Sequence, residues 1–415
     1  MENEQRRVPL IRFEGFRDDW EQCKLSEVVD VYDGTHQTPK YTDSGIKFVS
    51  VENISNLETE KYISQEAYEK EYAKKQAKKG DILMTRIGDI GTTRVIDADE
   101  PLAYYVTLAL LKPKMIESNF LSWLISSPEV QRNIWKRTLH IAFPKKINLG
   151  EINQVDIMIP EEDEQQQIGI FFQQLDNTVT LQQRKLELLK KLKRGSLQQM
   201  FPQNKESVPK VRFADFDEEW EQHKFFDNIE NIIDFRGRTP KKLGMNWSKD
   251  GYLALSALNV KNGFIDPKVD AHYGNKKLYD KWMRGHELRK GQVLFTTEAP
   301  MGNVAQVPDN KKYILSQRTI AFTLKKDKIT DDFLATLLRT PKSFNELTSL
   351  SSGGTAKGVS QRSLSQFKIM TPQRLIEQRQ IGAFFKHLDD TITLRQQKLT
   401  LLKQLKKAFL QKMFI

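Results

Sequence analysis

The feature that most constrains this chain is an internal duplication that runs through nearly its whole length. Three segments recur in the same order about 200 residues later. Val8–Phe13 and Trp20 recur as Val208–Phe213 and Trp220. Lys79–Thr85 recurs as Lys290–Thr296, and Glu164–Phe201 recurs as Glu377–Phe414. In the last pair, 24 of the 38 aligned positions are identical. The offset drifts only from 200 to 213 residues, so insertions are confined to a few loops. A unit of this size indicates duplication of a whole domain and not a solenoid of short repeats.

The duplication also predicts where the domains end. Copy one runs from about residue 8 to 201 and copy two from about 208 to 414, and a length of 415 residues suits two domains. Between the copies lies the polar stretch Pro202–Ser207, which is typical of a short linker.

Each copy begins with short apolar segments separated by Gly, Asp and Thr, a pattern typical of strands and turns. We expect strands near residues 46–51 and 81–87, and an extended segment at 156–160 that recurs at 368–372. Leu121, Leu124 and Ile125 favour one helix over Phe120–Thr138, with a counterpart over Phe333–Ser349.

Each copy ends in a long predicted helix. Apolar residues follow one another at steps of four and three, which is typical of a coiled-coil seam: Ile168, Phe172, Leu175, Val179, Leu186, Leu189 and Leu192, then Ile381, Phe385, Leu388, Ile392, Leu399, Leu402 and Leu405. At 1.5 Å per residue the helix would be about 54 Å long. If the two helices pack antiparallel, they separate the globules, whereas a parallel pair would bring the globules together. Gln182 and Arg395 interrupt the stripes at equivalent positions, either to fix the register or because they face solvent.

Composition bounds the partners. The formal charge is +11, which attracts polyanions but also fits acidic proteins or membrane surfaces. The single cysteine, Cys23, cannot form an internal disulfide or a zinc site. There is no run of 18 apolar residues and the N-terminus is polar, so we expect a cytoplasmic protein without a membrane partner.

Taken together, several duplicated motifs resemble the specificity subunit of type I restriction-modification systems. They are Trp20, Gly80–Thr85, Ile157–Pro160, Glu164–Ile168, Leu175-Asp176 and Met200-Phe201, with Trp220, Gly291–Thr296, Ile369–Pro372, Glu377–Ile381, Leu388-Asp389 and Met413-Phe414 in copy two. Two departures are visible: Gln292 replaces the Asp of the Gly-Asp pair, and Thr371 stands where copy one has Ile159.

The resemblance implies an α+β fold with two tandem α/β target recognition domains and two long helices that form an antiparallel, pseudo-two-fold coiled coil. The boundaries would be 1–160, 161–201, 202–208, 209–372 and 373–415. Each domain would read one half of a bipartite, asymmetric site on double-stranded DNA. The helices would set the spacing and dock two modification (methyltransferase) subunits, and restriction (translocase/nuclease) subunits would join. S-adenosylmethionine, ATP and Mg²⁺ would belong to those partners, with no cofactor and no active site in this chain.

Base readout requires Arg, Lys, Asn, Gln, Ser or Thr on loops that reach the groove edges. The candidates in copy one are Thr35, His36, Gln37, Thr38, Thr85, Arg86 and Arg94. The candidates in copy two are Arg236, Arg238, Thr239, Lys241, Thr296, Thr297, Arg318, Thr355 and Lys357. Lys145 and Lys146 are candidates for phosphate contacts. For any single loop candidate, ordinary turn chemistry or surface solvation is the more common explanation; for Lys145 and Lys146 a solvated surface is at least as common.

Further apolar residues lie outside the helix seam: Phe171, Leu181 and Leu188, with Phe384, Leu394 and Leu401. We expect them to hold the modification subunits, unless they pack on the globules of the chain itself.

The sequence offers no recognisable catalytic motif. It has no Asn/Asp-Pro-Pro-aromatic methyltransferase motif and no GxxxxGK[ST] phosphate loop, and its six histidines lack paired metal-ligand spacing. Three other classes stay open on the residues alone: a bidentate DNA-binding regulator, a coiled-coil scaffold, and an enzyme with a site assembled from distant residues.

Overall fold

The computed structural model describes residues 7–203, 206–353 and 357–415. The chain forms two compact units, one with residues to 183 and residues 397–415, the other with residues 184–396. The unit boundaries fall within the two long helices, α6 (Glu162–Gln199) and α11 (Leu375–Lys412). Each unit therefore contains one globule, the first part of one long helix and the last part of the other.

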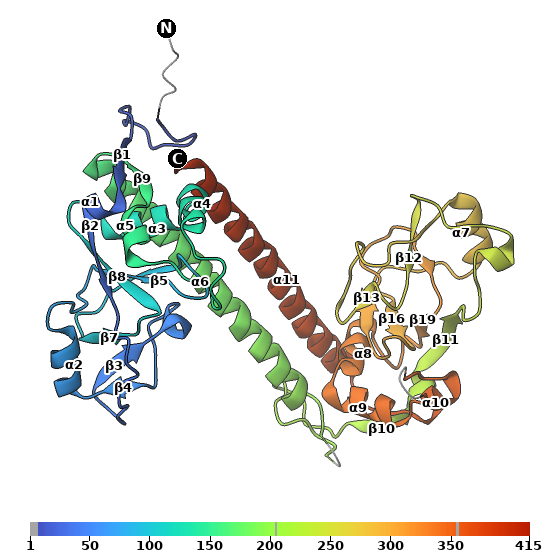
Figure 1. Cartoon of the computed structure of the whole chain (residues 1–415). Coiled ribbons are helices and arrows are strands. Elements are labelled where there is room, and N and C mark those ends of the chain that lie inside the picture. The colour runs from blue at the N-terminus through green and yellow to red at the C-terminus, as the bar shows by residue number, and fades with distance from the viewer. Residues whose placement is uncertain (1–6, 204–205, 354–356) are drawn as a thin grey trace, which may run out of the picture. The chain divides into compact units, whose positions relative to one another are not determined.

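Unit 1 is built on a four-stranded antiparallel sheet of order β2-β8-β5-β6 (Figure 1). A three-stranded sheet of order β4-β3-β7 includes the parallel pair β3–β7, and β1 pairs with β9. The elements are β1 (Glu21–Lys24), α1 (Leu25–Val28), β2 (Val29–Asp33), β3 (Ile46–Val49), β4 (Tyr62–Ile63), α2 (Gln65–Tyr72), β5 (Ile82–Thr85), β6 (Thr93–Val95), β7 (Leu102–Tyr104), β8 (Leu108–Pro113), α3 (Ser118–Ile125), α4 (Pro128–Lys136), α5 (Leu149–Asn153) and β9 (Asp156–Ile159).

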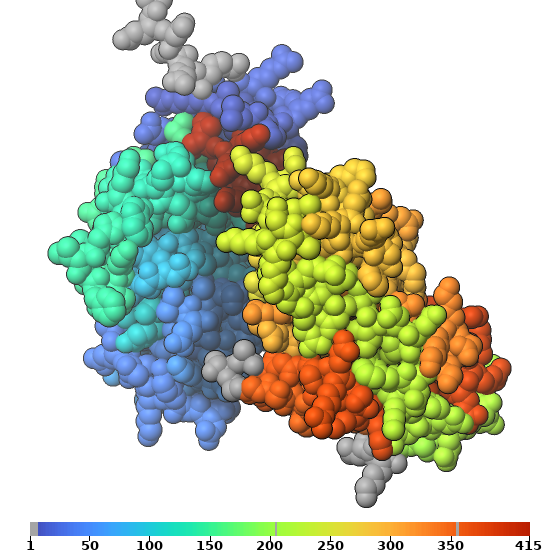
Figure 2. All heavy atoms as spheres, turned by 90° about the vertical axis from the view of Figure 1, so that its right-hand side faces the viewer, coloured from blue at the N-terminus to red at the C-terminus, as the bar shows by residue number. Residues whose placement is uncertain are grey.

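Unit 2 repeats this architecture with sheets β11-β19-β16-β17, β15-β12-β18 and β10-β20, and adds the small hairpin β13–β14. β10 pairs with β20, and Figure 2 shows orange-red residues beside yellow-green residues of this unit. The elements are β10 (Glu221–Lys224), β11 (Ile229–Asp234), β12 (Tyr252–Leu255), β13 (Val260–Lys261), β14 (Phe264–Ile265), β15 (Tyr273–Gly274), α7 (Lys276–Trp282), β16 (Val293–Thr296), β17 (Val304–Gln306), β18 (Ile314–Leu315), β19 (Thr319–Leu324), α8 (Asp331–Leu338), α9 (Pro341–Ser349), α10 (Gln361–Gln366) and β20 (Lys368–Thr371).

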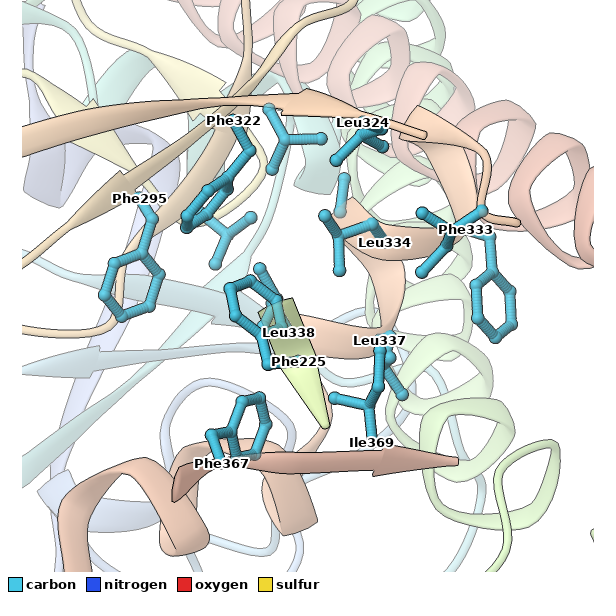
Figure 3. Packing of buried hydrophobic residues seen from close by; sticks show 14 of the residues in the cluster. Phe225, Phe295, Phe322, Leu324, Phe333, Leu334, Leu337, Leu338, Phe367 and Ile369 are labelled. Carbon is cyan, nitrogen blue, oxygen red and sulfur yellow. The ribbon is translucent and has the colours of Figure 1, made fainter. Parts of the chain in front are cut away.

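The central sheet of each unit is buried on both faces, which explains its uninterrupted apolar strands. On β5, Ile82 and Met84 face a core that includes the helices, while Leu83 faces a second core with β3 and β7. Side chains of a strand alternate between faces, so one apolar run supplies both cores. In unit 2, Phe295 and Phe322 face the helix-side core with α8 residues such as Leu334 (Figure 3).

The single helices expected over 120–138 and 333–349 are each two helices. The first breaks between α3 and α4, where Ser127 caps the new helix and Pro128 occupies its first turn. The second breaks in the same way, with Thr340 as cap before Pro341. Proline is well tolerated at a first helical position but blocks a helix interior, so the single-helix prediction was wrong. The expected strands and the long helices are confirmed.

Within each unit the long helices run antiparallel. In unit 1, Phe171 and Asp176 of α6 meet Phe409 and Lys406 of α11, so residue numbers rise on one helix as they fall on the other. In unit 2, Lys193 of α6 forms an ion pair of 2.5 Å with Asp389 of α11. Lys193 and Asp389 are the counterparts of Lys406 and Asp176 at the offset of 213 residues. The duplication therefore places equivalent ion pairs in both units.

The tail of each long helix completes a core. Phe414 packs against Trp20, Phe120 and Phe172 with ring centroids 6.2, 5.8 and 5.5 Å away. The equivalent Phe201 packs in unit 2, at 5.8 Å from Trp220, 5.8 Å from Phe333 and 6.1 Å from Phe385. The residues that end one copy in the sequence thus fill the other copy's globule. The core of neither globule is complete without the helix tail of the other copy.

A buried ion pair also closes each core. Arg12 donates to both carboxylate oxygens of Glu164 at 2.7 Å, and Arg212 binds Glu377 equivalently at 2.7 and 2.8 Å. A two-point contact between a planar guanidinium and a carboxylate fixes the orientation of both side chains in addition to pairing their charges. The Glu164 side chain is fully buried, and the pair raises the pKa of Arg12. These contacts tie the first residues of each copy to the start of its long helix.

Most of the predicted seam is buried, including Ile168, Phe172, Ile381 and Phe385. Leu192 and Leu405, which occupy equivalent positions, are instead 52% and 41% exposed, so the seam is shorter than expected. Phe171 and Phe384 pack inside their own units, against Phe13 with Phe409 and against Phe213. They are not free to hold a partner. Four leucines of the same predicted set remain at 48–66% exposure: Leu181, Leu188, Leu394 and Leu401.

Candidate DNA interface

Three loops of unit 1 converge at one end of the central sheet. They are residues 34–40 after β2, the turn 86–91 after β5, and the loop 137–148 between α4 and α5. Asp33 forms an ion pair with Arg86 and a hydrogen bond of 2.7 Å with the His36 ring. The Gly88 amide donates to the Lys145 carbonyl at 2.8 Å, which ties the second loop to the third. These contacts gather most of the residues predicted for copy one into one surface.

Two of the predicted residues hold this surface from inside. Thr85 is fully buried, and its hydroxyl accepts the Thr92 amide at 2.9 Å, which closes the turn. Arg86 is 7% exposed, with Nε on the Ile147 carbonyl at 3.2 Å and a guanidinium nitrogen on Asp33. We therefore correct their assignment: they position loops and do not face a groove.

The first loop has one buried and three exposed candidates. Thr35 is buried, and its backbone pairs with Tyr104 and Val106, so it is also a positioning residue. His36, Gln37 and Thr38 are exposed and stay candidates for DNA contact.

The basic candidates of unit 1 fall into two places. Lys145 and Lys146 are exposed on the third loop. Arg94 lies on the edge strand β6, with Asp97 at 3.7 Å, and lines a hollow of about 470 Å³ with Trp123 and Asp176.

Unit 2 gathers three equivalent loops in the same way. The Val359 amide donates to the Thr297 carbonyl at 2.9 Å, as Ile147 donates to Arg86 in unit 1. Thr296 is fully buried, and its hydroxyl accepts the Asn303 amide at 2.9 Å. Thr297 is 2% exposed and donates to the Arg318 carbonyl at 3.2 Å. Thr296 and Thr297, like Thr85, are corrected to positioning residues.

Exposed cations surround these loops. Arg318 is half-exposed and forms an ion pair of 2.7 Å with Glu298. Arg236 binds Asp234 at 2.6 Å. Burial works to raise the pKa of Asp234, but the bonds donated by Arg236 and Gln361 outweigh it and keep the pKa below its usual value. The Asp234 carboxylate therefore stays charged and orients Arg236.

A hollow of about 590 Å³ lies beside this loop cluster. Arg238, Thr239, Lys241 and Arg318 line it together with Trp247, Trp282 and His272. The Arg238 guanidinium lies 4.3 Å from the Phe235 ring and donates to the Trp282 carbonyl at 2.5 Å, so it is fixed in the wall. Lys241 is exposed at the rim. Lys357 is exposed on the third loop, and Thr355 lies outside the described residues.

The sequence reasoning missed the carboxylates that organise both surfaces. Asp33 is the last residue of β2, and Asp234 is the last residue of β11. Their carboxylates form ion pairs with arginines of the loops, and Asp234 also accepts a hydrogen bond from the Gln361 side-chain amide. Their position directly before the candidate loops in both copies was the available signal. Among residues 7–203, 206–353 and 357–415, no group of three His, Cys, Asp or Glu has the geometry of a metal site. Within the same ranges, no helix is long and apolar enough to cross a membrane.

The fold defines a class of proteins that repeat one mixed helix-and-sheet globule followed by one long helix. The chain belongs to the type I restriction-modification DNA specificity family, because residues 17–191 and 218–404 each match the family described as "Type I restriction modification DNA specificity domain". It is a specificity subunit with two tandem DNA specificity domains, which favours this interpretation over a regulator without an enzyme partner.

Individual relatives agree over nearly the whole chain. The MjaX specificity subunit of Methanocaldococcus jannaschii is 24% identical over 95% of this chain and 92% of its own length. The type I restriction enzyme MjaVIII specificity subunit of the same organism is 24% identical over 43% of this chain and 44% of its own. The crystal structure of the type I S subunit from M. genitalium covers 98% of this chain and 99% of its own, with a TM-score of 0.65 at 12% identity. That likeness supports the shared fold.

Proposed function

We propose that unit 1 and unit 2 each read one half of a bipartite DNA sequence, and that the long helices set the gap between the halves. The observation that carries the proposal is the pair of loop clusters. Equivalent buried threonines, Thr85 and Thr296, close the turns after β5 and β16, while the exposed residues around these turns differ between the units. Two different readers on one repeated scaffold are what an asymmetric two-part site requires.

The exposed leucines of the helices support a role in docking. Leu181 and Leu394 occupy equivalent positions, as do Leu188 and Leu401, and all four remain at 48–66% exposure. Apolar side chains repeated in this way on long helices are typical of surfaces that bind a protein partner. We assign them to two modification subunits, with restriction subunits joining the same complex.

The chemistry would then reside in the partners. S-adenosylmethionine would serve the methyltransferase subunits, and ATP with Mg²⁺ the restriction subunits, in the cytoplasm. This chain would contribute no catalytic group, and its part in the reaction is to deliver the methyltransferase to adenines in the two half-sites.

The proposal is tested by expressing the chain with a modification subunit and mapping methylated adenines across the host genome. A bipartite motif with a constant gap is expected. If an active partner yields no motif, the proposal fails.

Two variants assign the parts. Exchanging residues 1–160 for those of a relative should change one half-site only, and a change in both would refute independent reading. Adding one turn to both α6 and α11 should lengthen the gap, and an unchanged gap would refute the role of the helices as a ruler.

A further inference from the structure

The loop 137–148 of unit 1 ends in an apolar tip, Ile141–Pro144, that projects into solvent. Phe143 is 103% exposed and Ile141 is 99% exposed. The next most exposed large apolar side chain in the described ranges is Leu10, at 85%. A phenylalanine ring in this position contributes nothing to the core of the unit.

The foot of the loop is held firmly. The Leu139 amide donates to the Lys146 carbonyl at 2.8 Å, and the Ile147 amide donates to the Arg86 carbonyl at 3.0 Å. The centres of the His140 and Trp135 rings lie 4.3 Å apart, and the Lys145 ammonium lies 4.5 Å from the centre of the Trp135 ring. The tip is therefore presented on a fixed base.

Cations flank the tip in the sequence. Lys136, Lys145 and Lys146 are exposed, and within the described part of the chain no salt bridge neutralises them. Lys145 and Lys146 follow Phe143 by two and three residues, so their Cα atoms lie at most about 7–10 Å from the Cα atom of Phe143. An apolar tip with positive flanks complements a polyanion with an apolar interior, which is the character of duplex DNA.

The second unit shows that the fold does not demand this tip. Its equivalent loop has the same foot, because Ser352 pairs with Gly358 and Gly358 with Glu298, as Leu139 pairs with Lys146 and Lys146 with Ile87. Between Ser352 and Gly358 the sequence is Gly-Gly-Thr-Ala-Lys, with no large apolar residue. The apolar tip is therefore a property of one reader only.

We propose that Phe143 is a wedge that inserts between base pairs of the half-site read by unit 1, with Ile141 against the same step. Apolar side chains used in this way unstack a base step and bend the duplex, and the sequence at the step then matters through its deformability. Lys145 and Lys146 hold the adjacent phosphates. This inference rests on the proposed function and adds a recognition mode to one half-site.

The test uses the complex of the full chain with its modification subunits and duplexes that carry the mapped site. 2-Aminopurine replaces single bases through both half-sites, and its fluorescence rises where stacking is lost. A methyltransferase flips its target adenine out of the stack, so fluorescence should rise at the methylated adenine of each half-site. Beyond these two positions, the wild-type complex should raise fluorescence at one further step in the half-site of unit 1 and at none in the half-site of unit 2. Phe143→Ala should abolish that signal and weaken site binding on the order of tenfold, the scale of one aromatic–base contact. Phe143→Trp should retain the signal.

Met115→Ala is the matched control, because Met115 is 79% exposed on the same unit and lies far from the loop in sequence. It should leave both readouts unchanged. An unaltered fluorescence pattern in Phe143→Ala overturns the wedge, as does loss of the modification subunits from that variant on size-exclusion chromatography, which would make the tip a protein contact. If wild-type methylation is bipartite but no step other than the methylated adenines is unstacked, only the wedge fails. If no bipartite motif exists, the proposed function itself fails.

Discussion

Unit 1 and unit 2 are alike where they pack and different where they meet solvent. Phe414 and Phe201 fill equivalent places in the two cores. Equivalent threonines, Thr85 and Thr296, close the turns that follow β5 and β16. The exposed loops of the two units differ in the placement of charged residues and in apolar content. Between Leu139 and Lys146 unit 1 carries Phe143, whereas between Ser352 and Gly358 unit 2 carries glycines and Lys357. A duplicated scaffold can keep its interior constant because each core tolerates little change in volume, while its loops vary at little cost in stability.

The largest expected effect tests the exchange of helix tails. Phe414→Ala removes a ring that contacts Trp20, Phe120 and Phe172, and should lower the free energy of unfolding of unit 1 by about 3–5 kcal/mol. Phe201→Ala should do the same to unit 2. Hydrogen exchange read separately for each unit measures the effect, with exposed Leu401→Ala as control. Equal loss of protection in both units from either substitution would contradict the separate cores.

The buried ion pairs give a smaller and unequal effect. Glu164→Ala leaves Arg12 unpaired and should cost about 3 kcal/mol in unit 1. Glu377→Ala should cost about 1 kcal/mol more in unit 2, because the Trp220 indole also donates to Glu377 at 3.3 Å, whereas the Trp20 indole nitrogen has no partner in the described structure. Denaturant titration followed by unit-resolved hydrogen exchange distinguishes the two. Identical losses would show that the indole contact contributes nothing.

The loop cations should act on binding and leave stability unchanged. Lys146→Ala in unit 1 and Lys241→Ala in unit 2 should each reduce the salt dependence of DNA binding by about one phosphate contact, a slope change of roughly 0.9. The measurement is affinity of the complex for its site across salt concentrations. Lys70→Ala, at the end of α2, serves as control. A variant with an unchanged slope is not at the DNA.

The smallest effect compares the paired strands that close each unit. In unit 1, Lys24 lies opposite Asp156, and its bond lowers the pKa of that carboxyl; in unit 2, Lys224 lies opposite Lys368. A depressed carboxyl pKa stabilises the fold above the unfolded value near 4, and this stabilisation is lost as pH falls through the folded pKa. Between pH 5 and 3, unit 1 should therefore lose up to about 1 kcal/mol that unit 2 does not. In thermal melts, Asp156→Asn should remove this difference in pH dependence between the two units. If the pH profile of unit 1 is unchanged in the variant, Asp156 is not its source.

Much of the fold was accessible from residue pattern. The strands at 82–85 and 156–159 and both long helices were predicted because their apolar periodicity is strong. The break between α3 and α4 was missed because the apolar spacing continues through Ser127 and Pro128, and there the capping residue and proline prevail over the pattern. The candidate loops were found, but Thr35, Thr85, Arg86, Thr296 and Thr297 were misassigned, since the same polar residue types serve to contact DNA and to close turns.

The sequence by itself determined that the chain is two copies of one domain with one long helix each, because a repeat of 24 identities in 38 positions is legible without coordinates. Tertiary structure alone decided that each globule is completed by the tail of the other copy's helix, and that Asp33 and Asp234 gather loops far apart in the chain. Such contacts depend on chain folding in three dimensions, which periodicity does not encode. Whether a given arginine or threonine faces solvent or a carbonyl is likewise settled by packing and not by residue type.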